Sequence, residues 1–224
     1  MSLPGKMNIL ACLLGFGLLI SSVSFSKGDI GRDIEISSEV KKNKMELATF
    51  GSGCFWCTEA FFQRLEGVKK VASGYSGGHV KNPSYKEVCA GTTGHAEVIQ
   101  IQYDPLVISY GELLEVFWKT HDPTTLNRQG NDVGPQYRSV VFYHNEEQER
   151  LAKEFKKKLD QAGVFKDPIV TEISPYTSFY VAEDYHQNYF NENGSAPYCS
   201  FVIAPKVDKF EKVFGDKLKE NYSH

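Results

Sequence analysis

Two cysteines, Cys54 and Cys57, lie one helical turn apart in the segment GCFWCTEAFF. A thiol attacks well only as the thiolate, and the unpaired backbone N–H groups at a helix N-terminus stabilise that anion. The segment reads as a helix that begins at Cys54, runs to Leu65 and stops before Gly67. Cys54 lies in the first turn, so we expect it to be the attacking thiolate and Cys57 to be less favoured.

A C-x-x-C pair after a strand has three interpretations: redox chemistry, an inert buried pair, or half of a zinc site. The chain has no second C-x-x-C and its six histidines are scattered, so we predict no metal site. Phe55 and Trp56 are either core aromatics or a wall that receives a methyl or thioether group, because sulfur packs well against aromatic edges. A thioredoxin-like disulfide exchanger and a disulfide-stapled binding module remain open alternatives.

Length and composition predict one folded domain. The chain has 224 residues, 41% of them hydrophobic, which is enough for a sizeable core. Its formal net charge is -3, and the longest basic run is Lys156-Lys157-Lys158. We therefore expect no nucleic-acid partner.

The N-terminal segment differs from the rest of the chain. Residues 1–26 combine Lys6, an apolar run from Ile9 to Ile20 and small residues after it, a pattern typical of a signal peptide. The run is shorter than the ~20 residues of a spanning helix, and an N-terminal membrane anchor through residues 7–26 is the alternative. Residues 27–44 are polar and predict a flexible linker. We expect an exported protein, periplasmic or secreted, and a cytoplasmic one only if this segment is not a signal.

The domain is predicted to span residues 45–224. Hydrophobic patterns predict strands at 45–50, 68–75, 95–103, 138–143 and 168–173, and helices at 54–65, 109–120, 145–162 and 181–193. Ser109 with Glu112 forms a capping box, and Asn145 is a further helix cap. The order strand, helix, strand, strand, helix, strand predicts an α+β fold with a ferredoxin-like split β-α-β sandwich core, an extra C-terminal helix and loops. The long polar connectors are where we expect the site.

Four motifs follow one another along the chain: GCFWCTEAFF, GYSGGHVKNPSYKEVCAGTTGHAEVIQIQYDP, NRQGNDVGPQYRSVVFY and AEDYHQNYF. Together they resemble the A-class peptide-methionine sulfoxide reductases (MsrA), thiol-dependent oxidoreductases that reduce the S epimer of methionine sulfoxide and repair proteins after oxidative stress. The resemblance covers residues 45–212 and implies that the chain is such an enzyme.

The resemblance also implies roles for particular residues. A sulfoxide oxygen leaves only if it is protonated or hydrogen-bonded, and the family uses a protonated glutamate and two tyrosines. These correspond to Glu97 of GHAE, Tyr85 of SYKEV and Tyr137 of PQYRS. Asp132 of GNDVG corresponds to an aspartate that organises the site. His186 of DYHQ matches too, but we interpret it as structural.

The implied cycle leaves Cys54 as a sulfenic acid, which a second thiol converts to a disulfide. Cys199 occupies the place of a resolving cysteine in the C-terminal tail of other members, and Cys57 is the local alternative. We expect Cys89 to be buried and without a catalytic duty. No bound cofactor is expected; a thioredoxin-like dithiol is the implied reductant and partner, and we expect a monomer.

Overall fold

The computed structural model describes residues 44–222. The predicted signal or anchor segment, residues 1–26, and the linker up to residue 43 lie outside the described residues. Between residues 44 and 222 no helix is long and apolar enough to cross a membrane.

The domain is built on a six-stranded sheet with the order β7-β6-β1-β3-β2-β8. β1 pairs antiparallel with β3 and β6, β2 pairs antiparallel with β3 and β8, and only β6 and β7 run parallel. A two-stranded hairpin, β4-β5, lies apart from this sheet. The strands are β1 (Glu46–Ser52), β2 (Val68–Ser76), β3 (Ala96–Tyr103), β4 (Arg128–Gln129), β5 (Asp132–Val133), β6 (Ser139–Tyr143), β7 (Glu172–Pro175) and β8 (Phe179–Val181).

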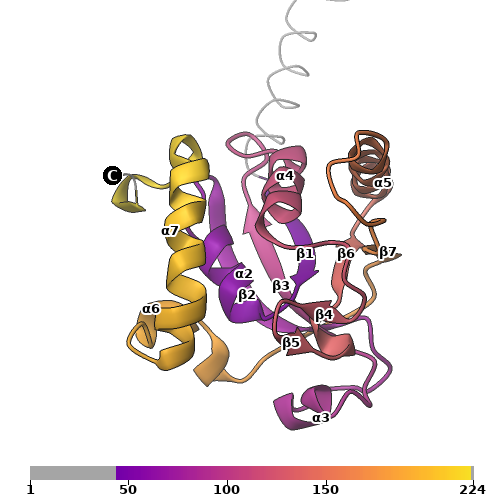
Figure 1. Cartoon of the computed structure of the whole chain (residues 1–224), viewed down its shortest axis with the longest axis vertical. Helices are drawn as coiled ribbons and strands as arrows, with labels where there is room; N and C mark the ends of the chain where they lie inside the picture. Colours follow the sequence, from indigo (N-terminus) through magenta and orange to yellow (C-terminus); the bar gives the residue numbers. More distant parts are fainter. Residues whose placement is uncertain (1–43, 223–224) are drawn as a thin grey trace, which may run out of the picture. The chain divides into compact units, whose positions relative to one another are not determined.

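Helices cover the sheet and one another. α2 packs against β1, β2 and β3, α4 packs against β1 and α5, and α7 lies against α2 (Figure 1). The helices are α2 (Phe55–Phe62), α3 (Tyr85–Cys89), α4 (Tyr110–Thr120), α5 (Glu146–Gln161), α6 (Tyr189–Glu192) and α7 (Ala204–Val213). Short 3-10 turns cover Pro135–Tyr137, Asp184–His186, Gly215–Lys217 and Glu220–Tyr222, and a π-helical turn covers Cys199–Ile203.

The two faces of the sheet are both buried, but unequally. Alternate residues of a strand point to opposite faces, so Ile99 and Ile101 of β3 enter the main core beneath the helices. Val98 of the same strand joins a small second cluster with Val140 and Phe142. Residues 96–99 of β3 are all buried because both faces of the sheet are covered at that end of the strand.

Most of the predicted elements are confirmed, and the α+β class with them. Ser109 and Glu112 form the predicted capping box at the start of α4, and the Asn145 side chain accepts a hydrogen bond from the Gln148 N–H at the start of α5. The strands predicted at 45–50, 68–75, 95–103 and 138–143 correspond to β1, β2, β3 and β6. The strand predicted at 168–173 lies later, as β7.

The single helix predicted at 181–193 is wrong. The chain there begins at the end of β8, passes through a 3-10 turn and ends in the short α6, because Gln187 is extended and Asn188 has a φ of 54°. The Gln187 side chain accepts from the Ser73 N–H and donates to the Ser73 carbonyl, so it completes the edge of β2 as a strand would. The long C-terminal helix is instead α7, which the sequence patterns did not identify.

Candidate active site

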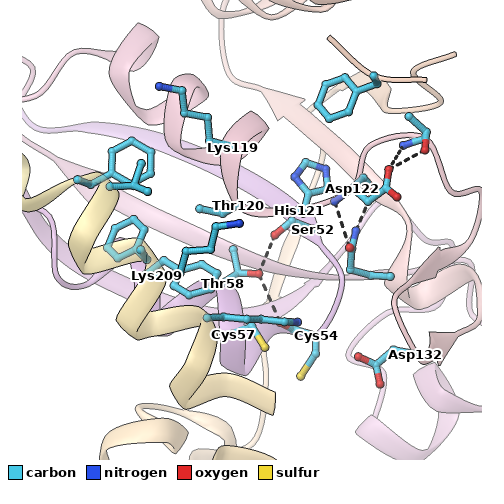
Figure 2. A pocket seen from close by; sticks show the side chains of 18 of the residues that line it. Ser52, Cys54, Cys57, Thr58, Lys119, Thr120, His121, Asp122, Asp132 and Lys209 are labelled. Carbon is cyan, nitrogen blue, oxygen red and sulfur yellow. Dashed lines mark hydrogen bonds between the residues drawn. The ribbon is translucent and has the colours of Figure 1, made fainter. Parts of the chain in front are cut away.

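Cys54 lies at the junction between β1 and α2. β1 ends at Ser52, Gly53 turns the chain with a φ of 96°, and Cys54 is the N-cap of α2. The Cys54 carbonyl accepts the N–H groups of Cys57 and Thr58 at 3.2 and 3.4 Å, and the Thr58 hydroxyl shares a 2.8 Å hydrogen bond with Ser52. Figure 2 shows both sulfur atoms at this helix start, where the prediction placed them.

Gly53 fixes this junction against the β4-β5 hairpin. A Cβ at Gly53 would lie 2.6 Å from the Cβ of Gln129, and Gln129 pairs with Asp132 across the hairpin. We expect Gly53→Ala to lower the free energy of unfolding by roughly 1–3 kcal/mol and to change the alkylation rate of Cys54, because backbone strain adds to the collision. Chemical denaturation and mass-spectrometric mapping of thiol labelling measure the two effects.

Gly163→Ala is the matched control, since Gly163 also has a positive φ, 60°, but nothing lies within 4 Å of its built Cβ. This variant is expected to lower the free energy of unfolding by roughly 1–2 kcal/mol through backbone strain alone and to leave the alkylation rate of Cys54 unchanged. Equal labelling of Cys54 in the Gly53→Ala variant and the wild type would show that the junction tolerates the added methyl group.

The two thiols form a coupled pair. The hydrogen bond to Cys57, desolvation and the nearby Glu97 raise the pKa of the Cys54 thiol well above its ordinary value. The hydrogen bond from Cys54, helped by the charge of Lys206, lowers the pKa of Cys57. The two thiols therefore titrate as a coupled pair in which Cys57 is the stronger acid, and the attack by Cys54 stays a prediction.

Glu97 lies beneath the start of α2. Its Oε2 accepts the Phe55 N–H at 3.1 Å, and only 1% of the residue is exposed. Burial raises the pKa of Glu97 to about 8, with a contribution from Asp132. The carboxyl group is therefore mostly protonated at neutral pH and can donate a proton near Cys54.

Two tyrosines face the same carboxyl group from separate elements. Tyr85 begins α3, whose capping box is formed by Ser84 and Glu87, and Tyr137 ends the 3-10 turn after β5. Desolvation and the proximity of Glu97 raise the pKa of both phenols, so both keep their protons. The structure thus brings two phenols and the Glu97 carboxyl group together, and their role as donors to a substrate oxygen stays a prediction.

Aromatic rings form a wall beside these donors. Phe55 is buried and contacts the rings of Tyr75 and His186, with centroids 6.0 and 5.1 Å away. Trp56 is half-buried, stacks on Tyr189 at 3.7 Å, and donates from Nε1 to His186 Nδ1 at 3.1 Å. Phe55 therefore belongs to the main core, Trp56 is held by His186 beside it, and a role of the two rings in receiving the methyl group stays a prediction.

His186, interpreted from the sequence as structural, packs against Phe55 and Trp56, and Tyr198 is a neighbour of the site that the sequence did not single out. His186 is 1% exposed and burial lowers its pKa, which suits the neutral imidazole that accepts from Trp56. The Tyr198 hydroxyl donates to Asp132 Oδ2 at 2.9 Å and also hydrogen-bonds Cys57. The motif AEDYHQNYF and the PYC segment around Cys199 carried the only sequence signal for them.

The remaining cysteines occupy opposite environments. Cys199 is completely buried in the π-helical turn before α7, and burial together with the charge of Cys57 raises its pKa. Cys89, expected to be buried, is exposed at the end of α3, where its thiol hydrogen-bonds Tyr85. Within residues 44–222 no cluster of three or more potential metal ligands is found.

Comparisons with known proteins agree with this geometry. The family model described as peptide methionine sulfoxide reductase matches residues 46–218. The chain is 57% identical over 187 residues to the peptide methionine sulfoxide reductase MsrA 1 of Rhodopirellula baltica, covering 84% of this chain and 96% of that protein. It is also 57% identical over 175 residues to the MsrA of Saccharolobus solfataricus, covering 78% of this chain and 98% of the relative.

Solved structures with the same fold come from the same group of enzymes. Reduced Mxr1 of Saccharomyces cerevisiae aligns with a TM-score of 0.64 and 37% identity, covering 70% of this chain and 90% of that one. The methionine sulfoxide reductase A of Corynebacterium diphtheriae aligns with a TM-score of 0.61 and 36% identity, covering 67% and 76%. The chain therefore belongs to the peptide methionine sulfoxide reductase family.

Proposed function

We propose that the protein reduces the S epimer of methionine sulfoxide, free or in proteins, and thereby repairs oxidised proteins. The observation that carries this is the protonated Glu97 carboxyl group held beside Cys54, with two tyrosine hydroxyls and an aromatic wall around it. Family membership supports the same reaction. A disulfide exchanger would have no use for these three O–H donors.

The first chemical step uses the Cys54 thiol and the Glu97 carboxyl group together. The Cys54 thiol loses its proton and attacks the sulfoxide sulfur as the thiolate, while Glu97 protonates the oxygen. Tyr85 and Tyr137 hydrogen-bond the same oxygen, and Phe55 with Trp56 holds the methyl end of the substrate. The S–O bond of the substrate breaks, methionine leaves, and Cys54 becomes a sulfenic acid, so the cysteine is oxidised as the sulfoxide is reduced.

Asp132 acts one step away from the reacting atoms. Its carboxylate accepts from Tyr198, and Tyr198 also hydrogen-bonds Cys57. Asp132 therefore orients the Tyr198 hydroxyl that contacts Cys57. The resemblance implied an aspartate with such an organising role.

The sequence favoured Cys199 as the resolving thiol with Cys57 as the alternative; the contact between Cys54 and Cys57 supports the alternative, so this scheme takes Cys57 first and Cys199 second. Cys57 already hydrogen-bonds Cys54, and a bridge one turn apart at a helix start is sterically accessible. Condensation of the Cys54 sulfenic acid with Cys57 releases water and leaves a disulfide. Cys199 lies close enough to Cys57 for the charge of Cys57 to raise its pKa. Its thiol can therefore attack the Cys54–Cys57 disulfide and form a new one by exchange.

A thioredoxin-like dithiol then reduces the disulfide and returns both thiols. Each methionine formed takes two electrons from the cysteines of the enzyme, and an external dithiol supplies two electrons to restore them. The proposed cycle uses no bound cofactor. We also propose that the protein is a monomer. The net charge of -3 supports the further proposal that it has no nucleic-acid partner.

The proposal includes the placement of the chain and the finer fold assignment. Residues 1–26 serve as a signal peptide or anchor, residues 27–44 as a linker and residues 45–224 as the reductase domain, which puts the enzyme outside the cytoplasm. The core strand order β6-β1-β3-β2, all antiparallel, supports a ferredoxin-like split β-α-β sandwich.

The experiment that tests the function counts turnovers. Pre-reduced enzyme is mixed with excess methionine S-sulfoxide and no reductant, and methionine formed per enzyme is measured. At least one equivalent is expected, with the R epimer unreduced. Disulfide exchange activity without any methionine would overturn the proposal in favour of a thioredoxin-like exchanger.

The same assay separates the two resolving thiols. Cys57→Ser is expected to form its equivalent of methionine but to leave Cys54 as a sulfenic acid that a dimedone probe traps, because the adjacent thiol is gone. Cys199→Ser is expected to form methionine and to retain a Cys54–Cys57 disulfide. Mass-spectrometric mapping of the disulfide after one turnover is the measurement. A Cys54–Cys199 bridge formed at the wild-type rate in Cys57→Ser would instead make Cys199 the first resolver.

A further inference from the structure

The Glu183 side chain connects three elements around the proposed site, and no step of the proposed reaction uses it. Its Oε2 accepts the hydroxyl of Tyr75 in β2 at 2.9 Å. Its Oε1 accepts the backbone N–H of Tyr85, the first residue of α3, also at 2.9 Å. The same Oε2 lies 4.0 Å from Nε2 of His186. One carboxyl group thus connects β2, α3 and the His186 imidazole.

Glu183 carries a negative charge in this position. Desolvation raises the pKa of its carboxyl group, but hydrogen bonds that include the Tyr85 N–H and the Tyr75 hydroxyl outweigh it and bring the pKa below its ordinary value. The side chain is 36% exposed, which also favours the charged form. The carboxylate therefore presents only acceptor atoms to His186.

The contact with Trp56 determines which nitrogen of His186 carries the proton. An indole N–H can only donate, and Trp56 Nε1 lies 3.1 Å from His186 Nδ1, so Nδ1 is the acceptor. Burial lowers the pKa of His186, so the ring is neutral and its one proton is on Nε2. Nε2 is buried and has no hydrogen-bond partner among residues 44–222. At 4.0 Å the Glu183 carboxylate is too far away for a hydrogen bond, but it attracts an Nε2–H and repels a lone pair there.

Two contacts hold the Trp56 indole. The ring stacks on Tyr189 with centroids 3.7 Å apart and an angle of 8° between the planes. Parallel stacking fixes the plane of a ring but resists sliding and rotation within that plane only weakly. The hydrogen bond to His186 acts on the edge of the indole and so restricts these remaining motions. The position of the indole therefore depends on the Nε2–H tautomer of His186.

We propose that Glu183 is a positioning residue for Trp56: its carboxylate holds the His186 proton on Nε2 and thereby keeps Nδ1 as the acceptor of the indole N–H. The inference rests on the proposed function, because the indole is expected to hold the methyl end of the substrate. Glu183 acts through His186 and touches no reacting atom, so its loss should weaken substrate binding more than it slows the chemical step.

Glu183→Gln tests the proposal because it changes the group that faces His186. The amide oxygen keeps the 2.9 Å hydrogen bond from the Tyr85 N–H, so the amide NH₂ points toward Nε2, and two donors face each other. The Nδ1–H tautomer is then preferred and the hydrogen bond from Trp56 is lost. In single turnovers with methionine S-sulfoxide, we expect the half-saturating concentration to rise about two- to tenfold, the effect of one hydrogen bond. The maximal rate should stay within about twofold of the wild type.

The indole N–H signals of ¹⁵N-labelled protein report the same contact without substrate. The chain has two tryptophans, and the buried Nε1 of Trp118 has no hydrogen-bond partner between residues 44 and 222, so Trp118 is an internal control for the fold. In Glu183→Gln the Trp56 proton signal should move upfield while the Trp118 signal stays. Glu183→Ala removes the carboxylate without adding a donor and should move the Trp56 signal in the same direction. An unchanged Trp56 signal in both variants overturns the proposal.

The imidazole of the wild-type protein gives a test that needs no substitution at Glu183. Long-range ¹H–¹⁵N spectra distinguish the two neutral tautomers, and the loss of one set of signals in His186→Gln assigns the ring. We expect the proton on Nε2. A proton on Nδ1 overturns the proposal, whatever the variants show.

The control variant is Glu87→Gln. Glu87 lines the same surface pocket as Glu183, but its carboxylate bonds to Ser84 in the capping box of α3, where glutamine also fits. Neither the Trp56 signal nor the half-saturating concentration is expected to change. An equal effect of Glu87→Gln would mean that any negative charge on this surface suffices, and the proposal would fail. A wild-type enzyme that forms no methionine would refute the proposed function instead, while the indole signal and the tautomer would still test the contact.

Discussion

Replacing Cys54 by serine is expected to lower the single-turnover rate of methionine sulfoxide reduction on the order of 10⁴-fold or more. A serine hydroxyl is a far weaker nucleophile than a thiolate, and loss of the attacking group removes the covalent step entirely. The measurement is methionine formed per enzyme over hours, with an intact near-ultraviolet spectrum as evidence of folding.

Cys57→Ser is the matched control, because it makes the same chemical change one turn away. It should still form an equivalent of methionine. The comparison is sharp because the pKa shifts favour Cys57 as the stronger acid, whereas the geometry favours Cys54 as the attacker. Cys54 is partly exposed and lies close to Glu97, while Cys57 is only 7% exposed. Activity that survives Cys54→Ser and disappears in Cys57→Ser would assign the attack to Cys57.

The sequence predicted correctly those features that depend on interactions within one helix or strand. The capping box at Ser109, the Asn145 cap and the alternating strand at residues 95–103 all follow from hydrogen bonds and burial within one element. Cys54 could be placed at the helix start on the same grounds. These signals require no knowledge of the partner strands.

Long-range contacts decided the rest. The helix expected at 181–193 is broken because Gln187 bonds to Ser73 on β2, far away in the sequence. The pKa of Cys57 is likewise lowered by the hydrogen bond from Cys54 and by Lys206 and Tyr198 from the C-terminal region. Glu97, Tyr85 and Tyr137 came from the family motifs, because nothing local distinguishes a buried acid on a strand from a solvated one.

These contacts explain why the site is spread over the whole domain. β1 and α2 supply the sulfur, β3 the acid, α3 and the turn after β5 the phenols, and the segment before α6 the imidazole that orients Trp56. Cys54 follows the end of β1, and Glu97 lies at the start of β3, which pairs antiparallel with β1. The sheet register therefore holds the distance between acid and thiol, and the loops can vary without changing it.

Glu97→Gln is expected to lower the rate of sulfoxide reduction by roughly 10²–10⁴-fold, the usual contribution of a positioned general acid. Glutamine keeps the size and the acceptor for the Phe55 N–H but has no acidic proton. The wild-type rate should also fall above about pH 8, where Glu97 ionises, and this fall should be absent from the residual rate of the variant. Single-turnover rates between pH 6 and 10 give both results.

A stability measurement tests the same carboxyl group independently of the chemistry. Its pKa rises from an ordinary 4.5 to about 8 on folding, so in that pH window the native state holds a proton that the unfolded state has lost. Stability therefore falls as pH rises between the two values, by up to about 1.4 kcal/mol per pH unit, and levels off above the higher one. Glu97→Gln lacks this loss, so denaturation should show the variant gaining on the wild type from pH 5 to pH 8. A constant difference between them would mean that Glu97 is ionised in the folded protein, and the acid that protonates the sulfoxide oxygen would have to be another group.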